Sequence, residues 1–360
     1  MTDLLPGFID RDWVAAALDR SGISGGATLA GIDFVGWIGT GQMARNGRIV
    51  LSWDESENRP ASAVVKVPSA DPEVAAFAFA TGGYLTELQF YRDVAPTVGC
   101  RVPACYRTEY RPDDLEFALL MEDIVGAEPG DQFAGLRPEQ LEATIAQTAR
   151  LHAPHYGDPT LAARAPGRDA AAAGDDFAEF AQMAYSAAVE PMIDRLGHGL
   201  HDDVIGLFEA VRPHVATWAR GGVAPETLIH GDLRGDNLLF RGDAASPEVV
   251  VVDWQTVRPG SAGADVAYLI SGSIADPAER AECEAQLVAS YLGAMATLGV
   301  DIDSRTFWQE YRLGSIWGLL ITAVATMQAT RTQRGDELFT IMAMRHGTQA
   351  LHLDPLGLLP

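Results

Sequence analysis

The segment from Leu228 to Phe240 constrains this chain more than any other. It reads Leu-Ile-His-Gly-Asp-Leu-Arg-Gly-Asp-Asn-Leu-Leu-Phe, and a run of valines that ends in Asp253 follows shortly after it. An Asp on a tight loop, an Asn five positions later and an Asp at the end of an apolar strand provide one base and two oxygen ligands for Mg²⁺. The pattern therefore predicts an active site for phosphoryl transfer.

Each residue of this pattern has an expected role. Phosphoryl transfer depends mainly on positioning and charge neutralisation, so Asp232 is expected to orient the acceptor hydroxyl and to take its proton. Asn237 would offer an amide oxygen to Mg²⁺, and Asp253 would bind the metal that bridges the β- and γ-phosphates. Arg234 is placed to direct its guanidinium at the migrating phosphoryl group.

These residues carry a resemblance to a known superfamily. The loop from His230 to Asn237 is similar to the catalytic loop of aminoglycoside phosphotransferases and choline kinases, the small-molecule relatives of protein kinases. More narrowly, residues 253–258 and 265–268 resemble the ecdysteroid-kinase-like branch, as do residues 120–124 and 149–153. The resemblance covers roughly residues 30 to 330. It implies a protein-kinase-like fold, with ATP and Mg²⁺ as cofactors.

A nucleotide site is predicted upstream of the catalytic loop. The segment Ala63-Val64-Val65-Lys66-Val67 reads as a short strand, and Lys66 would bind the α- and β-phosphates. Residues 83–91 have a helical pattern, and Glu87 within them would pair with Lys66. Taken alone, either residue could be an ordinary solvated charge. The order Lys, Glu, Asp, Asn, Asp along the chain favours the nucleotide site.

The remaining nucleotide contacts are predicted from a glycine-containing hairpin and from a hinge. The backbone at Gly39, Thr40 and Gly41 would approach the triphosphate, because glycine lets the main chain come close. The resemblance places the hinge after the apolar strand at residues 117–121, although Val64 and Leu239 could also be core residues only. Adenine would then contact Met121, Glu122 and Ile124, with Val64 and Leu239 as apolar cover.

The expected fold is α+β, with two lobes of the protein-kinase type. Residues 1–123 would form an N-terminal nucleotide-binding lobe, in which a small antiparallel sheet packs against the Glu87 helix. Residues 124–360 would form a larger, mainly helical lobe for catalysis and substrate binding. Within it, Asp265 is expected to accept backbone N–H bonds from the catalytic region, and His152 and His230 are expected to be structural.

Composition narrows the choice of partners and location. The formal net charge of −23 disfavours nucleic acid and anionic membranes as partners, because both require basic patches. Three cysteines without metal-ligand spacing, and an N-terminus without a secretory pattern, predict a reducing cytoplasm. Residues 313–330 carry no charge, but Gly, Ser, Thr and Gln dilute their hydrophobicity, so we expect a buried helix there.

The short interval between Asp253 and Asp265 bears on the acceptor. It leaves no room for the activation loop of protein kinases, so the acceptor hydroxyl is expected on a small-molecule alcohol. Both an apolar alcohol and a polycationic sugar remain possible acceptors, and the pattern does not indicate an oligomeric state. Two alternatives stay open: an aminoglycoside-type antibiotic phosphotransferase, and a nucleotide-binding pseudokinase that regulates a partner.

Overall fold

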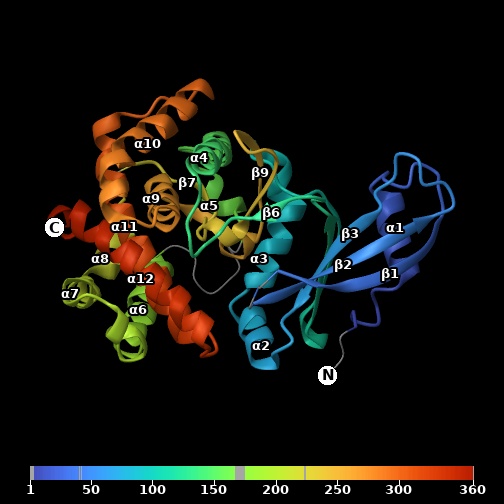
Figure 1. Cartoon of the computed structure of the whole chain (residues 1–360), viewed down its shortest axis with the longest axis horizontal. Coiled ribbons are helices and arrows are strands. Elements are labelled where there is room, and N and C mark those ends of the chain that lie inside the picture. Colours follow the sequence, from blue (N-terminus) through green and yellow to red (C-terminus); the bar gives the residue numbers. More distant parts are fainter. Residues whose placement is uncertain (1–3, 40, 42, 167–174, 223, 360) are drawn as a thin grey trace. The chain divides into compact units, whose positions relative to one another are not determined.

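A computed structural model of the chain describes residues 4–39, 41, 43–166, 175–222 and 224–359. The chain divides into two compact units, which Figure 1 colours along the sequence. The first comprises Met1–Pro96 and Val102–Gly126, and the second comprises Thr97–Arg101 and Ala127–Pro360. The two units are described separately below.

The first unit is built on a five-stranded antiparallel sheet with the strand order β1-β2-β3-β5-β4. The strands are β1 (Leu29–Ile38), β2 (Ala44–Trp53), β3 (Ser62–Pro68), β4 (Cys105–Arg111) and β5 (Glu116–Glu122). Its helices are α1 (Arg11–Arg20), α2 (Pro72–Ala80) and α3 (Gly83–Gln89), and a π-helical turn at Phe90–Val94 continues α3. This is the antiparallel sheet that the sequence predicts.

Alternation along β3 distributes its side chains between the two faces of the sheet. Val65 packs in a hydrophobic cluster with Trp13 and Leu18 of α1, which therefore covers one face. Its neighbour Lys66 points to the opposite face, where it meets α3. A stacked ring pair, Tyr84 of α3 on Phe117 of β5 with centroids 4.6 Å apart, holds α3 there.

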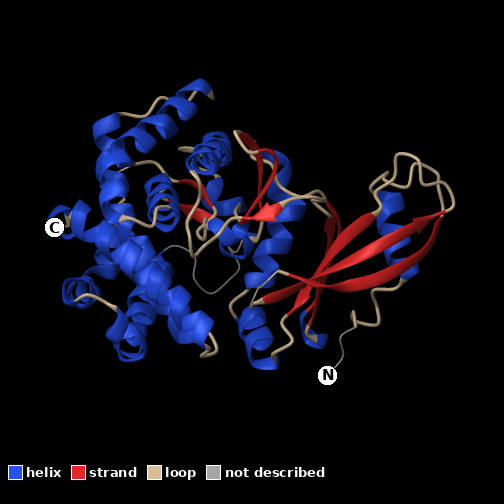
Figure 2. Cartoon of the chain, viewed as in Figure 1, coloured by secondary structure: helices blue, strands red, loops and turns tan. Residues whose placement is uncertain are grey.

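The second unit is mainly helical, as Figure 2 shows. Its helices are α4 (Pro138–His152), α5 (Leu161–Arg164), α6 (Asp175–Leu196), α7 (Asp202–Val211), α8 (Val215–Arg220), α9 (Ala262–Ser273), α10 (Pro277–Thr297), α11 (Ser304–Gln328) and α12 (Gln333–Leu353). Its short strands form two small sheets, one of β6 (Glu128–Pro129), β8 (Leu238–Asp243) and β9 (Ser246–Val251), the other of β7 (Thr227–Ile229) and β10 (Arg258–Gly260). A small antiparallel-sheet lobe and a mainly helical remainder confirm the predicted fold class.

Helices α9 and α11 form the centre of the second unit. They cross where Gly263 and Gly314 meet, and a Cβ atom on Gly314 would lie 2.5 Å from the carbonyl carbon of Gly263. Such a close approach is possible only with glycine at the crossing. Of the predicted buried helix at residues 313–330, residues 313–328 belong to α11, where Ile316, Trp317 and Leu320 lie in a hydrophobic cluster with α6 and α12. Within the described ranges, none of the helices is long and apolar enough to cross a membrane.

Candidate active site

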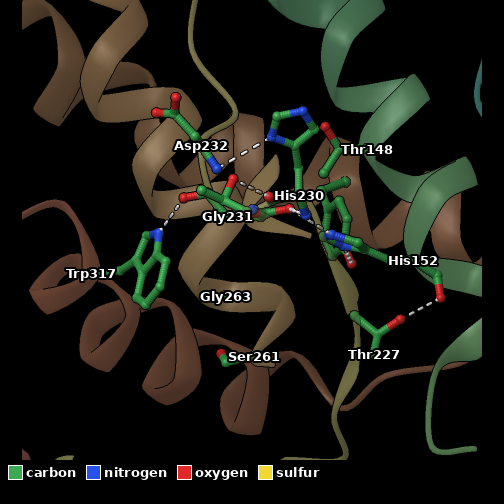
Figure 3. A network of polar contacts seen from close by, with 12 residues as sticks. Thr148, His152, Thr227, His230, Gly231, Asp232, Ser261, Gly263 and Trp317 are labelled. Carbon is green, nitrogen blue, oxygen red and sulfur yellow. Dashed lines mark hydrogen bonds and ion pairs between the residues drawn. The ribbon is translucent and has the colours of Figure 1, made fainter. Parts of the chain in front are cut away.

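Strand β7 leads directly into the loop that carries Asp232. Gly231 has a φ of +81°, and a Cβ atom there would lie 2.7 Å from the carbonyl oxygen of Thr256. A side chain at this position would therefore strain the backbone and clash. The Gly231 carbonyl accepts a hydrogen bond of 2.8 Å from Nε1 of Trp317. Figure 3 shows Trp317 on one side of Gly231 and the His230 ring on the other.

Asp265, on the first turn of α9, anchors the loop through both of its oxygens. Oδ2 accepts the backbone N–H of His230 at 2.7 Å, and Oδ1 accepts that of Gly231 at 2.9 Å. Burial alone would raise the pKa of Asp265, but the hydrogen bonds from His152 and from the Gly231 N–H outweigh burial and lower it. The carboxylate therefore stays charged, and the prediction that Asp265 accepts backbone bonds from this region is confirmed.

His230 is fully buried, and both of its ring nitrogens are engaged. Nδ1 accepts the backbone N–H of Asp232 at 3.2 Å, and Nε2 donates to the carbonyl of Val252 at 3.0 Å. These partners assign the neutral tautomer with its proton on Nε2. His230 therefore joins the catalytic loop to the end of β9, as a structural brace. His152 is likewise structural, because its nitrogens contact Tyr291 and Asp265.

The Asp232 carboxylate is held by three donors. Oδ1 accepts the hydroxyl of Tyr268 at 2.8 Å. Oδ2 accepts Nδ2 of Asn237 at 2.9 Å and Nε of Arg234 at 3.1 Å. The Asp232 side chain is nevertheless 22% exposed to solvent. This is an oriented carboxylate that can still be reached from solvent, which is the arrangement a general base requires.

Arg234 binds two carboxylates of its own loop. Its Nε meets Asp232, and its Nη1 donates to Asp236 at 2.7 Å. Burial works to lower the pKa of Arg234, but these two carboxylates and Tyr268 outweigh it and leave the pKa raised. The guanidinium is therefore a permanent positive charge beside Asp232.

Asp253 follows β9, and its neighbour Val252 is hydrogen-bonded to the backbone of Asn237. The N–H of Val252 donates to the carbonyl of Asn237 at 3.0 Å, so the residue before Asp253 is tied to the catalytic loop. Asp253 itself has a φ of +68°, an unfavourable region for a residue with a side chain. The chain therefore leaves β9 through a residue in the left-handed region.

The donor set fits Mg²⁺. Nδ2 of Asn237 donates to the backbone oxygen and to Oδ2 of Asp232, at 2.8 and 2.9 Å, which leaves its amide oxygen for a metal. An amide oxygen and a carboxylate are hard ligands of the kind that Mg²⁺ selects. Among the described residues, no cluster of three or more His, Cys, Asp or Glu could hold a metal by protein groups alone. Two protein ligands suit a metal that is otherwise bound by phosphates and water.

In the first unit, the expected ion pair is present. Nζ of Lys66 lies 2.8 Å from Oε1 and 2.7 Å from Oε2 of Glu87. Both side chains are almost completely buried, at 5% and 1% exposure. Glu87 is thus no surface charge, and it fixes the ammonium group of Lys66 on the α3 face of the sheet.

The other predicted nucleotide contacts are distributed over both units. Gly39, with a φ of +74°, and Gly41 lie between β1 and β2, whereas Thr40 falls outside the described residues. Val64 of β3 pairs with Met121 of β5 in the sheet register. At the end of β5, the N–H of Glu122 donates to the carbonyl of Ala104, and Ile124 follows as a buried residue. Leu239 belongs to the second unit, where it is half-buried on β8.

Two residues of this site were not predicted from the sequence. Tyr268 is three residues after Asp265 on α9, so the helical period places both on neighbouring positions of one face. That spacing could have indicated Tyr268 as a second contact of the loop. Trp317 lies in the stretch that was expected to form a buried helix, and no local pattern indicates that its indole N–H binds the carbonyl of Gly231.

Comparison with known proteins gives the family of the chain and the structures that share its fold. The model of the phosphotransferase enzyme family matches residues 48–300, well over half of the chain. No curated protein sequence matches it significantly. The solved GDP complex of wild-type aminoglycoside 2'-phosphotransferase-IIIa is 15% identical, with a TM-score of 0.53, over 92% of this chain and 98% of that chain.

Two further solved structures have similar folds. Choline kinase from Cryptosporidium parvum Iowa II is 12% identical with a TM-score of 0.52, over 91% of this chain and 92% of that one. Ethanolamine kinase from Plasmodium vivax is 12% identical with a TM-score of 0.51, over 90% and 81%. At such low identity these structures show a common fold alone, and the ecdysteroid-kinase-like branch stays a prediction. The family model, which matches residues 48–300, establishes that the chain belongs to the phosphotransferase enzyme family.

Proposed function

We propose that this protein is an ATP-dependent small-molecule kinase that transfers the γ-phosphate to the hydroxyl of an alcohol. The observation that carries the proposal is the Asp232 carboxylate, which Tyr268, Arg234 and Asn237 hold in one orientation. A carboxylate that is both oriented and reachable can align a hydroxyl and accept its proton as the new P–O bond forms.

Arg234 supplies charge near the reacting groups. Its side chain is tied to Asp232 and Asp236, and its pKa is raised, so it remains cationic throughout the reaction. A fixed guanidinium beside the base can stabilise negative charge on the migrating phosphoryl group. We assign Arg234 this role.

Asn237 and Asp253 would hold Mg²⁺. When bound, the metal neutralises charge on the β- and γ-phosphates. Asn237 directs its amide nitrogen at Asp232, and the backbone bond from Val252 keeps Asp253 next to it. The same bonds therefore connect the proposed metal ligands to the proposed base.

For the nucleotide, we assign ATP contacts to Lys66 of the first unit and to further residues, of which Leu239 belongs to the second unit. Glu87 holds the Lys66 ammonium group for the α- and β-phosphates. The remaining contacts are the glycine turn at Gly39, Thr40 and Gly41, the hinge residues Met121, Glu122 and Ile124, and the apolar side chains of Val64 and Leu239.

A screen for alcohol-dependent ADP release tests the proposal. The purified protein, Mg-ATP and a panel of alcohols, amino alcohols, hydroxy acids and aminoglycosides should give ADP with at least one class of acceptor. Release with aminoglycosides alone would favour the antibiotic phosphotransferase. Binding of ATP without turnover on any acceptor would favour the pseudokinase, and absence of both would contradict the proposed function.

A further inference from the structure

A guanidinium that stacks on one aromatic ring and lies near a second is found beside the catalytic loop of the second unit. The Cζ atom of Arg258, on β10, lies 3.4 Å from the ring centroid of Phe177 on α6. It lies 5.4 Å from the ring of Trp317 on α11. A third ring, Trp218 of α8, lies 6.3 Å from that of Trp317. The aromatic faces hold the planar cation in place and leave its N–H edges for another partner.

Arg258 has no acceptor of its own in the part of the chain that the structure describes. No hydrogen bond or ion pair joins it to any of those residues. Glu226 and Asp265 act on it only through space. Asp265 already accepts from His230, Gly231 and His152. An unpaired guanidinium is unexpected in a chain with 49 acidic residues and only 26 basic ones.

The nitrogen atoms of Arg258 remain accessible. None of them is a fully buried donor without a hydrogen-bond partner. Since they make no hydrogen bond to the described residues, their donors face solvent. Burial of the rest of the side chain lowers the pKa of Arg258 to about 10, which still leaves it charged at neutral pH. The group is therefore a partly desolvated cation with open donors, which is a strong site for an oxyanion.

Two contacts connect this group to the proposed base. Arg258 pairs with Ile229 in the β10–β7 ladder, and Ile229 is the last residue of the strand that leads into the catalytic loop. Trp317, the second ring of the stack, donates its indole N–H to the carbonyl of Gly231, next to Asp232. A molecule that binds Arg258 would therefore lie close to the loop that carries the base.

We infer that Arg258, with Phe177 and Trp317, forms an acceptor subsite for a carboxylate, so that the phosphorylated alcohol is a hydroxy acid. The inference rests on the proposed function and narrows its acceptor class. A guanidinium receives a carboxylate through two parallel N–H···O bonds, and the rings cover the apolar part of the acceptor. The same positive charge disfavours cationic acceptors such as amino alcohols and aminoglycosides.

Matched acceptors test the charge preference. Each of two sets contains a carboxylate, a neutral diol and an amino alcohol, in that order. The first set is hydroxyhexanoate, hexanediol and aminohexanol, and the second is hydroxymethylbenzoate, benzenedimethanol and aminomethylbenzyl alcohol. Binding of the first set is followed by tryptophan fluorescence, because Trp317 and Trp218 flank the site, and turnover by ADP release. The carboxylate of each set should have the lowest dissociation constant and the lowest KM, by roughly ten- to a hundredfold.

Variants test the residue. Arg258→Gln should raise the KM and the dissociation constant of the carboxylates roughly tenfold or more, with little change for the diols, and Arg258→Lys should recover part of the loss. Arg331→Gln is the control, because Arg331 is exposed and pairs with Asp336 far along the chain from the catalytic loop. Melting temperature reports whether each variant folds.

The outcomes separate the subsite from the proposed function. Absence of saturable carboxylate binding to the wild type, or equal binding to Arg258→Gln, would overturn the subsite. A fall in kcat for every acceptor, without a change in KM for carboxylates, would also overturn it and place Arg258 on the phosphoryl group. Mg-ATP binding by calorimetry decides the proposed function independently: carboxylate binding that depends on Arg258, without any nucleotide binding, would support the subsite and reject the kinase.

Discussion

The proposed chemistry depends on one residue, Asp232. Replacing it by Asn removes the proton acceptor but keeps the size of the side chain, so Mg-ATP should still bind while turnover falls by about a thousandfold. Asp243→Asn, at the last residue of β8, is the matched control and should behave as the wild type. Turnover by Asp232→Asn at the wild-type rate would reject Asp232 as the base.

Tyr268 positions this base through a single hydrogen bond. Its hydroxyl donates to Oδ1 of Asp232 at 2.8 Å, so Tyr268→Phe should lower kcat about fivefold, the usual effect of one lost hydrogen bond, without changing the KM for ATP. Tyr185→Phe removes an equally buried hydroxyl, which donates to Phe208 at 3.0 Å in the hydrophobic core. Steady-state kinetics of the two variants compare the loss of a tyrosine hydroxyl inside the site with the loss of one outside it. An equal kcat for both would show that Tyr268 only supports the fold.

His346 makes stability depend on pH. Its ring stacks on Tyr268 at 4.7 Å, and burial, with help from Arg345 and Arg280, lowers the pKa of His346 from 6.5 to about 3. Between these two values the unfolded chain binds a proton that the folded chain does not, so stability falls as the pH is lowered. The free energy of unfolding falls through this group by about 1.4 kcal/mol for each pH unit between the two pKa values.

His346→Phe should remove this contribution. The free energy of unfolding, measured with urea between pH 7 and pH 4, should then depend less steeply on pH, by the equivalent of about one proton. Above pH 7 the residue is neutral in both states, so wild type and variant should differ there by a constant amount. An unchanged slope in the acid range would show that His346 does not titrate on unfolding.

At the scale of elements, the crossing of α9 and α11 sets the geometry of the site. Helix α9 carries Asp265 and Tyr268, and α11 carries Trp317, so all three contacts to the loop depend on this crossing. Gly314→Ala would place a Cβ atom 2.5 Å from the Gly263 backbone. The helices must then separate, which should cost about 1 to 3 kcal/mol of stability and reduce turnover.

Gly293→Ala is the matched control for this prediction. Gly293 lies in α10, and a Cβ atom there would meet nothing within 4 Å. The higher helix propensity of Ala should leave stability unchanged or raise it by up to about 1 kcal/mol. Thermal unfolding of both variants gives the comparison. A Gly314→Ala protein as stable as Gly293→Ala would contradict the close contact between α9 and α11.

Elements with a clear local pattern could be predicted from the sequence. The β-branched residues of the segment from Ala63 to Val67 predicted β3, and the helical pattern at residues 83–91 predicted α3. The spacing of Asp232, Asn237 and Asp253 predicted a catalytic loop. The role of Trp317 could not be predicted, because its bond to Gly231 joins residues 86 positions apart. The left-handed backbone of Asp253 was equally hidden, since Asp after a valine run usually continues in extended geometry.

At the scale of the whole molecule, the proposal assigns nucleotide contacts to both compact units. Lys66 and Glu87 belong to the first, and Asn237 and Asp253 to the second. If the proposal is correct, nucleotide binding must be lost when the residues of either unit are changed. Replacing both Lys66 and Glu87, by Met and Leu, removes the pair without leaving one buried charge unpaired, which would destabilise the first unit.

The most direct test is a calorimetric titration of the whole protein with ATP, in the presence and absence of Mg²⁺. We expect metal-dependent binding to the wild type and to the Asp243→Ala control. It predicts loss of that binding both in Asp253→Ala and in the double variant of Lys66 and Glu87. Undiminished Mg-ATP binding to Asp253→Ala, or no binding to the wild type, would contradict the central claim that this is a nucleotide-dependent phosphotransferase site.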